Sequence, residues 1–474
     1  MKKTIFILSL WGLASQAASM SLEEFLQRAE EKNKTFQSLE KAKASSVYKR
    51  EKGDLELAAQ LTAKVGMRDD KSITQSPSLF GTRTQSTEYS LGFDKRFSTG
   101  TAASVSYSLS SIDIEFPSPT APVSRYMGSW NFAVSQSLWK NSFGQSVDLR
   151  RQRESYVEKL EIQSIEVQRR QTLVEVESLF WDTLYAQQEL SVREESLARA
   201  KKIESWVQRR LENGIGDKSD LLQAQALVQQ RELQLAIAQD ELIAAQKKVR
   251  DQLDLSTDAV IPSFVGNVNE RRDFKKMVAK LSQQGSIVRM DSYLSFLEMR
   301  TKKLVQQEVE EGLKPDLLLE GSYKTSGVDT SYASAASRAT DQDHSVLAAA
   351  VKFVWLWDDG SKSAAQKTAL TDYESSKLKA ERKLLEGKTA WAELVRRHEE
   401  MSRKVKLAAQ LSQIQTEKVK TESDKLSKGR TITSQVITAE QDASEAELNA
   451  IKLKVEQRKM ESQARLFVQS EEAL

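Results

Sequence analysis

Cysteine is absent from the 474 residues, and histidine occurs only at His344 and His398. The chain therefore forms no disulfide and offers no thiolate ligand to a metal. The two histidines lie 54 positions apart, which is not the spacing of a local metal site. No Ser/His/Asp set and no supported carboxylate pair stands out, so we expect no cofactor, no metal and no enzymatic activity.

An excess of charge of one sign is also missing. Lys and Arg number 70, and Asp and Glu number 67. Loss of Lys2 and Lys3 with a leader peptide would leave 68 basic residues and a net charge of +1. A chain this close to balance lacks the basic surface of a general nucleic-acid binder, so we expect no nucleic-acid partner.

Long apolar runs are scarce, and the clearest one lies at the N-terminus. Lys2 and Lys3 precede the apolar segment 4–14, and small residues follow it, which predicts a secretory signal peptide over 1–19. A short N-terminal anchor is the alternative, but the run is too short to span a bilayer. No later run reaches about 18 apolar residues, so only a β-barrel could carry the exported chain across a membrane.

Proline is rare too, and none of the six prolines lies in 146–255 or 361–474. Both stretches are rich in strong helix formers, and Leu173, Val176 and Phe180 follow one another at helical spacing. The longest predicted helix would measure about 100 Å at 1.5 Å per residue, so it needs packing partners along its whole length. The predicted helices are 21–58, 146–212, 217–255, 288–312, 361–426 and 432–470.

Two other regions, about 59–140 and about 316–357, alternate apolar and polar side chains with the period of a strand. Each run is about ten residues long, which is the length of a tilted strand that crosses an outer membrane. A soluble β-sandwich is the alternative. Aromatic residues near the strand ends favour the membrane, and the candidates for its interface are Trp130, Trp139, Trp355 and Trp357.

The chain repeats itself once. The segment GIGDKSDLLQA at 214–224 aligns with GRTITSQVITA at 429–439. Upstream, SLWKNSFG ending at Gly144 aligns with VWLWDDG ending at Gly360. Each half then has the order helix, strands, long helix, turn and helix, which is a duplicated half-protein rather than a solenoid.

The two predicted repeats, 20–255 and 256–474, differ in length before their long helices. The first has about forty more residues in its strand region, which fit one additional β-hairpin at about 86–113. The first half thus carries four predicted strands and the second carries two. The second repeat opens with a separate segment, 256–288, before its first predicted helix.

These features together resemble the outer membrane efflux protein family, the TolC-type outer membrane factors. The resemblance rests on the signal peptide, on LKPDLLLEGSY before a strand, and on an aromatic strand end followed by glycine and a long helix. It rests also on the paired corners ENGIGDKSDLLQAQ and SKGRTITSQVITAEQ. It covers nearly the whole mature chain.

The resemblance implies an α+β membrane protein of the outer membrane that extends into the periplasm. In a homotrimer, long antiparallel helical hairpins would form an α-barrel continuous with a transmembrane β-barrel surrounded by outer-membrane lipid. Helical strips around 256–290 and at the C-terminus would form an equatorial belt. The family usually supplies four strands per protomer and twelve per trimer. The extra hairpin departs from this pattern, and we favour eighteen strands because both added runs have membrane-spanning length.

The family also implies a function. The chain would be the passive exit duct of a tripartite efflux pump or a type I secretion system, gated at its periplasmic tip. Its partners would be a periplasmic adaptor (membrane fusion) protein and an inner-membrane transporter. The alternative is a periplasmic coiled-coil adaptor or scaffold without a pore, which would not need aromatic alternating strands.

The corner at 214–224 has a structural interpretation and a functional one. A phosphate loop is excluded because Ser219 stands at the third glycine of G-x-G-x-x-G and a helix precedes. Structurally, Gly214 would end one helix, Asp217 would cap the next, and Asp220 would lie in its first turn. The resemblance places these corners at the periplasmic entrance.

Two aspartates of the second repeat line that entrance in the family's best-known member, and they match Gln435 and Thr438 here. The acidic ring is therefore missing from the second repeat, and the equivalent places in the first are Asp220 and Gln223. We hypothesise that Asp220, with Asp217, forms an acidic ring that favours cations. Helix capping alone is the alternative.

The tips of the two corners are candidates for adaptor contact: Gly214, Gly216, Gly429 and Arg430. Arg430 could equally bridge to a neighbouring helix or be a solvated turn residue.

Overall fold

The computed structural model describes residues 20–73, 75–117, 121–256, 261, 263–265, 274, 278 and 287–469. The predicted signal peptide and most of the predicted segment 256–288 lie outside these residues. The chain divides into two compact units, which we describe separately. The helical unit comprises Met1–Lys43, Gln163–Leu294 and Arg382–Leu474, and the sheet unit comprises Ala44–Ile162 and Ser295–Glu381.

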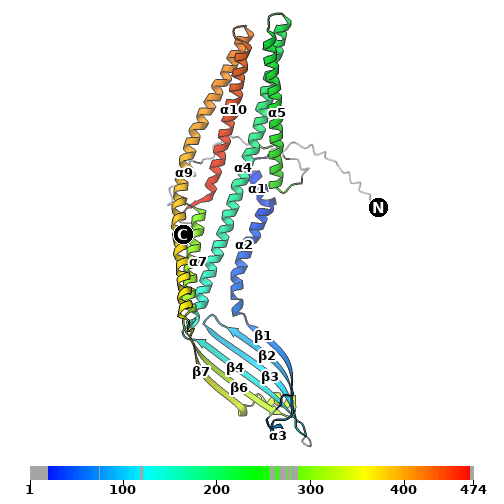
Figure 1. The fold of residues 1–474 in the computed structure, drawn as a ribbon, viewed down its shortest axis with the longest axis vertical. Coiled ribbons are helices and arrows are strands. Elements are labelled where there is room, and N and C mark those ends of the chain that lie inside the picture. The colour runs from blue at the N-terminus through cyan, green and yellow to red at the C-terminus, as the bar shows by residue number, and fades with distance from the viewer. Residues whose placement is uncertain are drawn as a thin grey trace, which may run out of the picture. The chain divides into compact units, whose positions relative to one another are not determined.

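The sheet unit contains one six-stranded antiparallel sheet with the order β1-β2-β3-β4-β6-β7 (Figure 1). The hairpin predicted at about 86–113 is β2 and β3, and it lies inside the sheet rather than beyond its edge. Four strands precede the first long helix and two precede the second. The strands are β1 (Gln60–Asp70), β2 (Arg83–Arg96), β3 (Thr101–Glu115), β4 (Val123–Ser137), β6 (Asp316–Asp329) and β7 (Ser345–Val354).

The strand register gathers the apolar side chains on one face of the sheet. Phe93 lies opposite Val105, and Val105 lies opposite Phe132. Across the junction of the two chain halves, Phe132 lies opposite Tyr323, which lies opposite Leu347. Because side chains alternate between the faces of a strand, the polar residues between them share the other face.

The two edge strands of the sheet, β1 and β7, have one strand neighbour each among the described residues. Every residue of β7 is exposed. Since all neighbours are antiparallel and the strands number six, β1 and β7 run in opposite directions. Each edge therefore presents backbone N–H and C=O groups that can pair with another strand.

A short helix, α8 (Tyr332–Arg338), lies between β6 and β7 and covers part of the apolar face. It approaches so closely that a Cβ on Gly128 would lie 2.8 Å from the carbonyl oxygen of Ala335. The Tyr332 ring lies 4.4 Å from the Tyr126 ring and 6.3 Å from the Tyr89 ring. Glycine in β4 thus permits a helix to seat directly on the sheet.

The helical unit is built around two helical hairpins, α4–α5 and α9–α10 (Figure 1). Its main core joins Phe25, Phe180 and Phe264, whose rings lie 4.9 to 5.8 Å apart. No helix in the described ranges is both long enough and apolar enough to cross a membrane. Over both units, the longer helices are α1 (Leu22–Lys32), α2 (Lys34–Lys52), α4 (Gln145–Glu212), α5 (Lys218–Gln252), α7 (Met290–Gly312), α9 (Asp359–Ser427) and α10 (Thr433–Ser462).

The helix predicted over 21–58 is wrong as a single element, because it breaks at Asn33. This residue has an extended backbone with ψ of 125°. Its side-chain amide donates to the carbonyl oxygen of Gln252 at 2.7 Å, and its Oδ1 accepts from the backbone N–H of Thr35 at 2.7 Å. These bonds compete with the helical ladder. After α2 the chain continues as a 3-10 turn, η1 (Gly53–Leu57).

Two more helix boundaries differ from the prediction for one shared reason. The strand β5 (Ile287–Arg289) pairs antiparallel with β8 (Phe467–Gln469). The helix predicted from 288 therefore begins at Met290, and the helix predicted to reach 470 ends at Ser462. This pairing joins segments far apart in the sequence, so local propensity does not reveal it.

Candidate functional site

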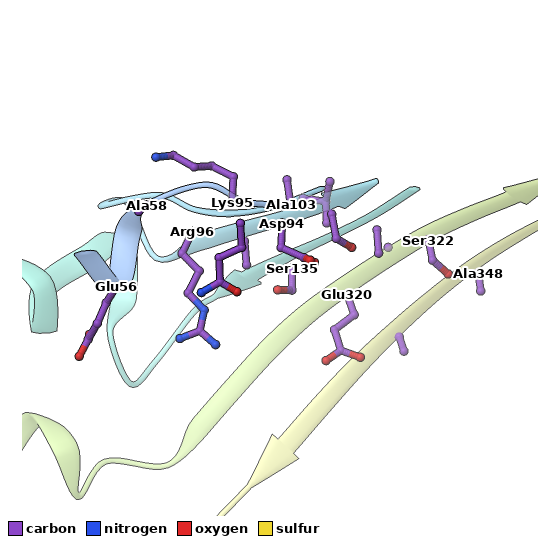
Figure 2. Close-up of a pocket in the computed structure, with 17 residues that line it drawn as sticks. Glu56, Ala58, Asp94, Lys95, Arg96, Ala103, Ser135, Glu320, Ser322 and Ala348 are labelled. Atoms are coloured by element: carbon purple, nitrogen blue, oxygen red, sulfur yellow. The ribbon is translucent and has the colours of Figure 1, made fainter. Parts of the chain in front are cut away.

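The polar face of the sheet is hollowed by a pocket of about 700 Å³. Asp94, Arg96, Ser135 and Glu320 extend from the same side of the sheet into this space, whereas Lys95 points to the opposite side (Figure 2). Lys95 donates to the carbonyl oxygen of Leu57 at 2.6 Å, which explains how a lysine interrupts the apolar row of β2. Most of the other lining residues are alanine, serine or glycine.

Register produces this polar surface. Asp94 lies opposite Ser104, while Ser135 lies opposite Glu320, which in turn lies opposite Ala350. In the described residues neither Asp94 nor Glu320 has an ion-pair partner. Asp94 is exposed and Glu320 is half-buried. A wall of serines, alanines and unpaired charges suits water and hydrated solutes.

The opposite face is a large exposed apolar surface that runs from β1 to β7. Met67 on β1 and Leu347 on β7 are each 82% exposed, and Leu91, Phe93 and others between them are also exposed. A soluble monomer rarely exposes so extensive an apolar patch. This surface therefore needs lipid or another apolar partner.

Three of the four predicted interface tryptophans lie just beyond strand ends. Trp139 follows β4, and Trp355 and Trp357 follow β7, so all three lie where a strand leads into a long helix. The Trp355 and Trp357 rings pack 5.0 Å apart, and the ammonium of Lys362 lies 4.9 Å from the Trp355 ring. Aromatic rings with a nearby cation are common at the border of a bilayer.

Trp130 differs from that prediction because it lies in the middle of β4. Its ring is 4.8 Å from that of Tyr107, its register partner on β3. The aromatics at the far end of the apolar face are instead Tyr89, Tyr126 and Tyr332. Sequence reasoning missed this group because α8, which brings Tyr332 to the sheet, lies in a segment without a strand or long-helix pattern.

The first helix corner, between α4 and α5, has the geometry that its sequence predicts. Gly214 has φ of 71°, which glycine adopts without strain. The N–H of Gly214 bonds to the carbonyl of Leu211, and that of Ile215 bonds to the carbonyl of Arg210, which together form a Schellman motif. Asp217 then caps α5 by accepting from the N–H of Ser219 at 2.8 Å.

The second corner, between α9 and α10, repeats the glycine and replaces the cap. Gly429 has φ of 68°. The N–H groups of Gly429 and Arg430 donate to backbone carbonyls in the last turn of α9, in the same pattern as in the first corner. Ile432 stands at the N-cap without a side-chain bond. The hydroxyl of Thr431 instead contacts Oε2 of Glu422 at 3.1 Å and Oε1 of Gln435 at 2.6 Å. Neither hydrogen-bonding contact of Thr431 was predicted from the sequence.

The structure places the remaining gate candidates on the first two turns of α5 and α10. Asp220 is half-buried and Gln223 is exposed. Gln435 and Thr438 are exposed, and the Thr438 hydroxyl donates to the carbonyl of Ser434 within its own helix. Asp220 has no ion-pair partner in the part of the chain that the structure describes.

The two tips also expose other candidates for contact. Gly216 is half-exposed beside the end of α4, and Arg430 is exposed. Each tip carries one exposed isoleucine, Ile215 in the first corner and Ile432 in the second.

Comparisons with known proteins agree with these surfaces. Residues 99–253, which contain the β3–β4 strands and the α4–α5 hairpin, match the family model of outer membrane efflux proteins. The resemblance predicted from the sequence is confirmed. The predicted location, the outer membrane with an extension into the periplasm, is that of outer membrane efflux proteins.

Solved structures of outer membrane channels share the fold over nearly the whole chain. The outer-membrane channel OprN matches with a TM-score of 0.67 at 13% identity, covering 94% of this chain and 89% of its own. VceC from Vibrio cholerae matches with a TM-score of 0.67 at 10% identity, covering 94% and 95%. The Campylobacter jejuni channel CmeC matches with a TM-score of 0.67 at 12% identity, covering 94% and 85%. No curated protein matches the sequence.

Proposed function

We propose that this chain is the outer-membrane exit duct of a tripartite efflux pump or a type I secretion system. The sheet carries the proposal, because it has one apolar face and one polar, hollowed face. A sheet of this kind suits lipid on one side and water on the other. The chain would act as a passive conduit that catalyses no reaction and uses no cofactor.

The conduit would be a homotrimer whose copies join through the sheet edges. An open edge cannot stand in lipid, because its backbone groups would have no hydrogen-bond partner. Since β1 and β7 run in opposite directions, β1 of one copy can extend the antiparallel order from β7 of another. Three copies of a six-stranded sheet would close an eighteen-stranded barrel continuous with a helical barrel.

Exposed apolar residues on the helices support lateral packing between copies. On α9, Leu407, Leu411 and Ile414 are exposed at helical spacing, and on α5 Leu233 and Ile237 are also exposed. Each forms a narrow apolar stripe on an otherwise polar helix. Stripes of this kind are buried by a neighbouring helix in a coiled coil or bundle.

The helix corners would form a gate at the periplasmic tip. Three copies of Asp220, with Asp217 nearby, would favour cations there. A periplasmic adaptor protein, itself joined to an inner-membrane transporter, would dock near Ile215, Ile432 and Arg430. Docking would open the duct by changing the contacts between neighbouring corners.

Cysteine pairs test the trimer cleanly because the natural chain has no cysteine. We would combine Val65→Cys on β1 with Val351→Cys on β7, and shift each by two residues to sample the register. We expect oxidised outer-membrane fractions to yield covalent dimers and trimers on non-reducing gels. The matched control joins Val351→Cys with Leu91→Cys on the inner strand β2 and should remain monomeric.

Two outcomes would count against the proposal. If every pair stays monomeric in protein that fractionates with the outer membrane, the edges do not join copies. If the protein is recovered as a soluble periplasmic species, it is a coiled-coil scaffold or adaptor without a pore. Deletion of the gene should also sensitise cells to the exported compounds or abolish secretion of a polypeptide.

A further inference from the structure

A layer of polar side chains is buried within the helical unit, between α4, α5 and α10. Two arginines meet there: Arg193 on α4 and Arg231 on α5 both donate through Nη1 to Oε1 of Gln234, at 3.0 and 2.8 Å. We call Arg193, Arg231 and Gln234 the arginine layer. Glu440 of α10 lies close enough to influence the charge of Arg231.

Arg231 is 2% exposed, yet one edge of its guanidinium has no acceptor. Its Nε and Nη2 atoms are buried without a hydrogen-bond partner, and these two N–H groups point in the same direction. Nε of Arg193 and the hydroxyls of Ser196 and Ser444 are also buried and unpartnered. Ser196 lies one turn from Arg193 on the same side of α4.

The arginines of this region differ in their ion pairs. Arg193 pairs with Glu189 at 3.1 Å, and Arg199 pairs with the buried Glu440. Arg231 has no carboxylate within ion-pair distance among the described residues. Burial lowers the pKa of the Arg231 guanidinium, and a nearby Glu440 opposes that shift, but arginine remains protonated at physiological pH. Arg231 is therefore a buried cation without a direct ion pair, although the carboxylates of Glu440 and Glu445 lie near enough to oppose the lowering of its pKa.

We propose that a small inorganic anion of the charge and size of chloride binds between α4, α5 and α10 at the open edge of Arg231. Two parallel N–H donors on one guanidinium edge match an anion, and an anion also gives Arg231 the direct ion pair that it lacks. Water would accept the same bonds but would leave the charge unpaired. A carboxylate of another protein cannot reach a side chain that is 98% buried within its own unit.

The anion would fasten the two helical hairpins together. Arg231 belongs to the α4–α5 hairpin, and Ser444 and Glu440 belong to α10, so a bound anion would contact or neutralise groups of both hairpins. This inference does not depend on conduction. It concerns the packing of one chain and holds whether or not the protein is a pore.

Thermal unfolding of the full-length protein in detergent tests the site. Helix loss is followed by circular dichroism at matched ionic strength in sodium chloride and in sodium gluconate, whose anion is too large for a buried site. We expect the Tm of the natural protein to be several degrees higher in chloride. Arg231→Met, which keeps the length of the side chain, should have the same Tm in both salts.

Two further variants make the result specific. Arg209→Met removes an exposed arginine of α4 and should keep the full chloride dependence. Arg231→Lys keeps the charge without the paired donors and should keep a weaker dependence, which also serves if Arg231→Met fails to fold. Equal Tm values in the two salts for the natural protein, or an undiminished chloride effect in Arg231→Met, would overturn the proposal and leave water as the occupant.

Discussion

The cap of α5 yields the most closely specified prediction. Asp217 accepts from the N–H of Ser219 at 2.8 Å, and both residues are exposed. Replacing an N-cap Asp by Ala costs about 1 kcal/mol. That loss would raise the population of the frayed first turn of α5 about fivefold, because 1.4 kcal/mol corresponds to a factor of ten. The corner would loosen without unfolding the helix.

Hydrogen–deuterium exchange on peptides that span 214–224 measures this fraying. We expect Asp217→Ala to speed exchange there about fivefold, with no change in peptides from the second corner, which has no side-chain cap. Asp217→Asn removes the charge but keeps a good capping residue, so exchange should stay near that of the natural protein. Equal exchange in Asp217→Ala and the natural protein would refute the role of the cap.

Four other predictions follow from the structure. Asp220→Asn should lower the cation selectivity of the conducting protein in planar bilayers, because it removes an unpaired carboxylate from each copy. Phe180→Ala should destabilise the helical unit by about 3–5 kcal/mol in urea unfolding, because the ring is fully buried between two phenylalanines. Gly128→Ala should displace α8 and speed its proteolysis, because the new Cβ would lie 2.8 Å from the Ala335 carbonyl oxygen. Glu447→Gln should raise the Tm at pH 7 and have little effect near pH 4. Burial raises the pKa of the Glu447 carboxyl above 4.5, so the carboxylate destabilises the fold only as the pH rises through the raised pKa.

Each of these has a contradicting result. An unchanged reversal potential in Asp220→Asn would leave capping or packing as the role of that residue. A decrease of less than about 1 kcal/mol in the free energy of unfolding of Phe180→Ala would mean that the neighbouring side chains move in to fill the cavity. An unchanged rate of proteolysis in Gly128→Ala would show that α8 does not depend on its close contact with Gly128. An increase in Tm for Glu447→Gln that is equal at both pH values would show that the effect does not come from ionisation of Glu447.

The sequence predicted well the features that depend on residues close together in the chain. The alternation of Leu91 and Phe93 with polar neighbours sufficed to predict β2, and lack of proline sufficed for α4 and α9. Gly214 and Asp217 identified a helix end and a cap because both roles depend on bonds within six residues. The sequence alone left open whether the extra hairpin joins the other strands. The sheet order answers this for the single chain, because it places β2 and β3 between β1 and β4.

Contacts between distant segments explain what the sequence did not predict. Asn33 breaks a helix because Gln252 supplies an acceptor, and β5 exists because β8 pairs with it. Thr431 binds Glu422 across a corner, and in the sequence neither residue differs from an ordinary helix-end side chain. Arg231 likewise has the sequence context of a solvated charge on a helix, and only packing against α4 and α10 buries it.

Single-channel recording tests the central claim most directly. The full-length protein, purified from the outer-membrane fraction, would be added to a planar lipid bilayer. A passive exit duct predicts discrete conductance steps of one main size that require no nucleotide or other energy source. Because the proposed gate opens on docking, Asp217→Ala, which loosens the first corner, would be recorded beside the natural protein. Inserted, folded protein that yields no steps in either form would contradict the claim that this chain forms a conduit.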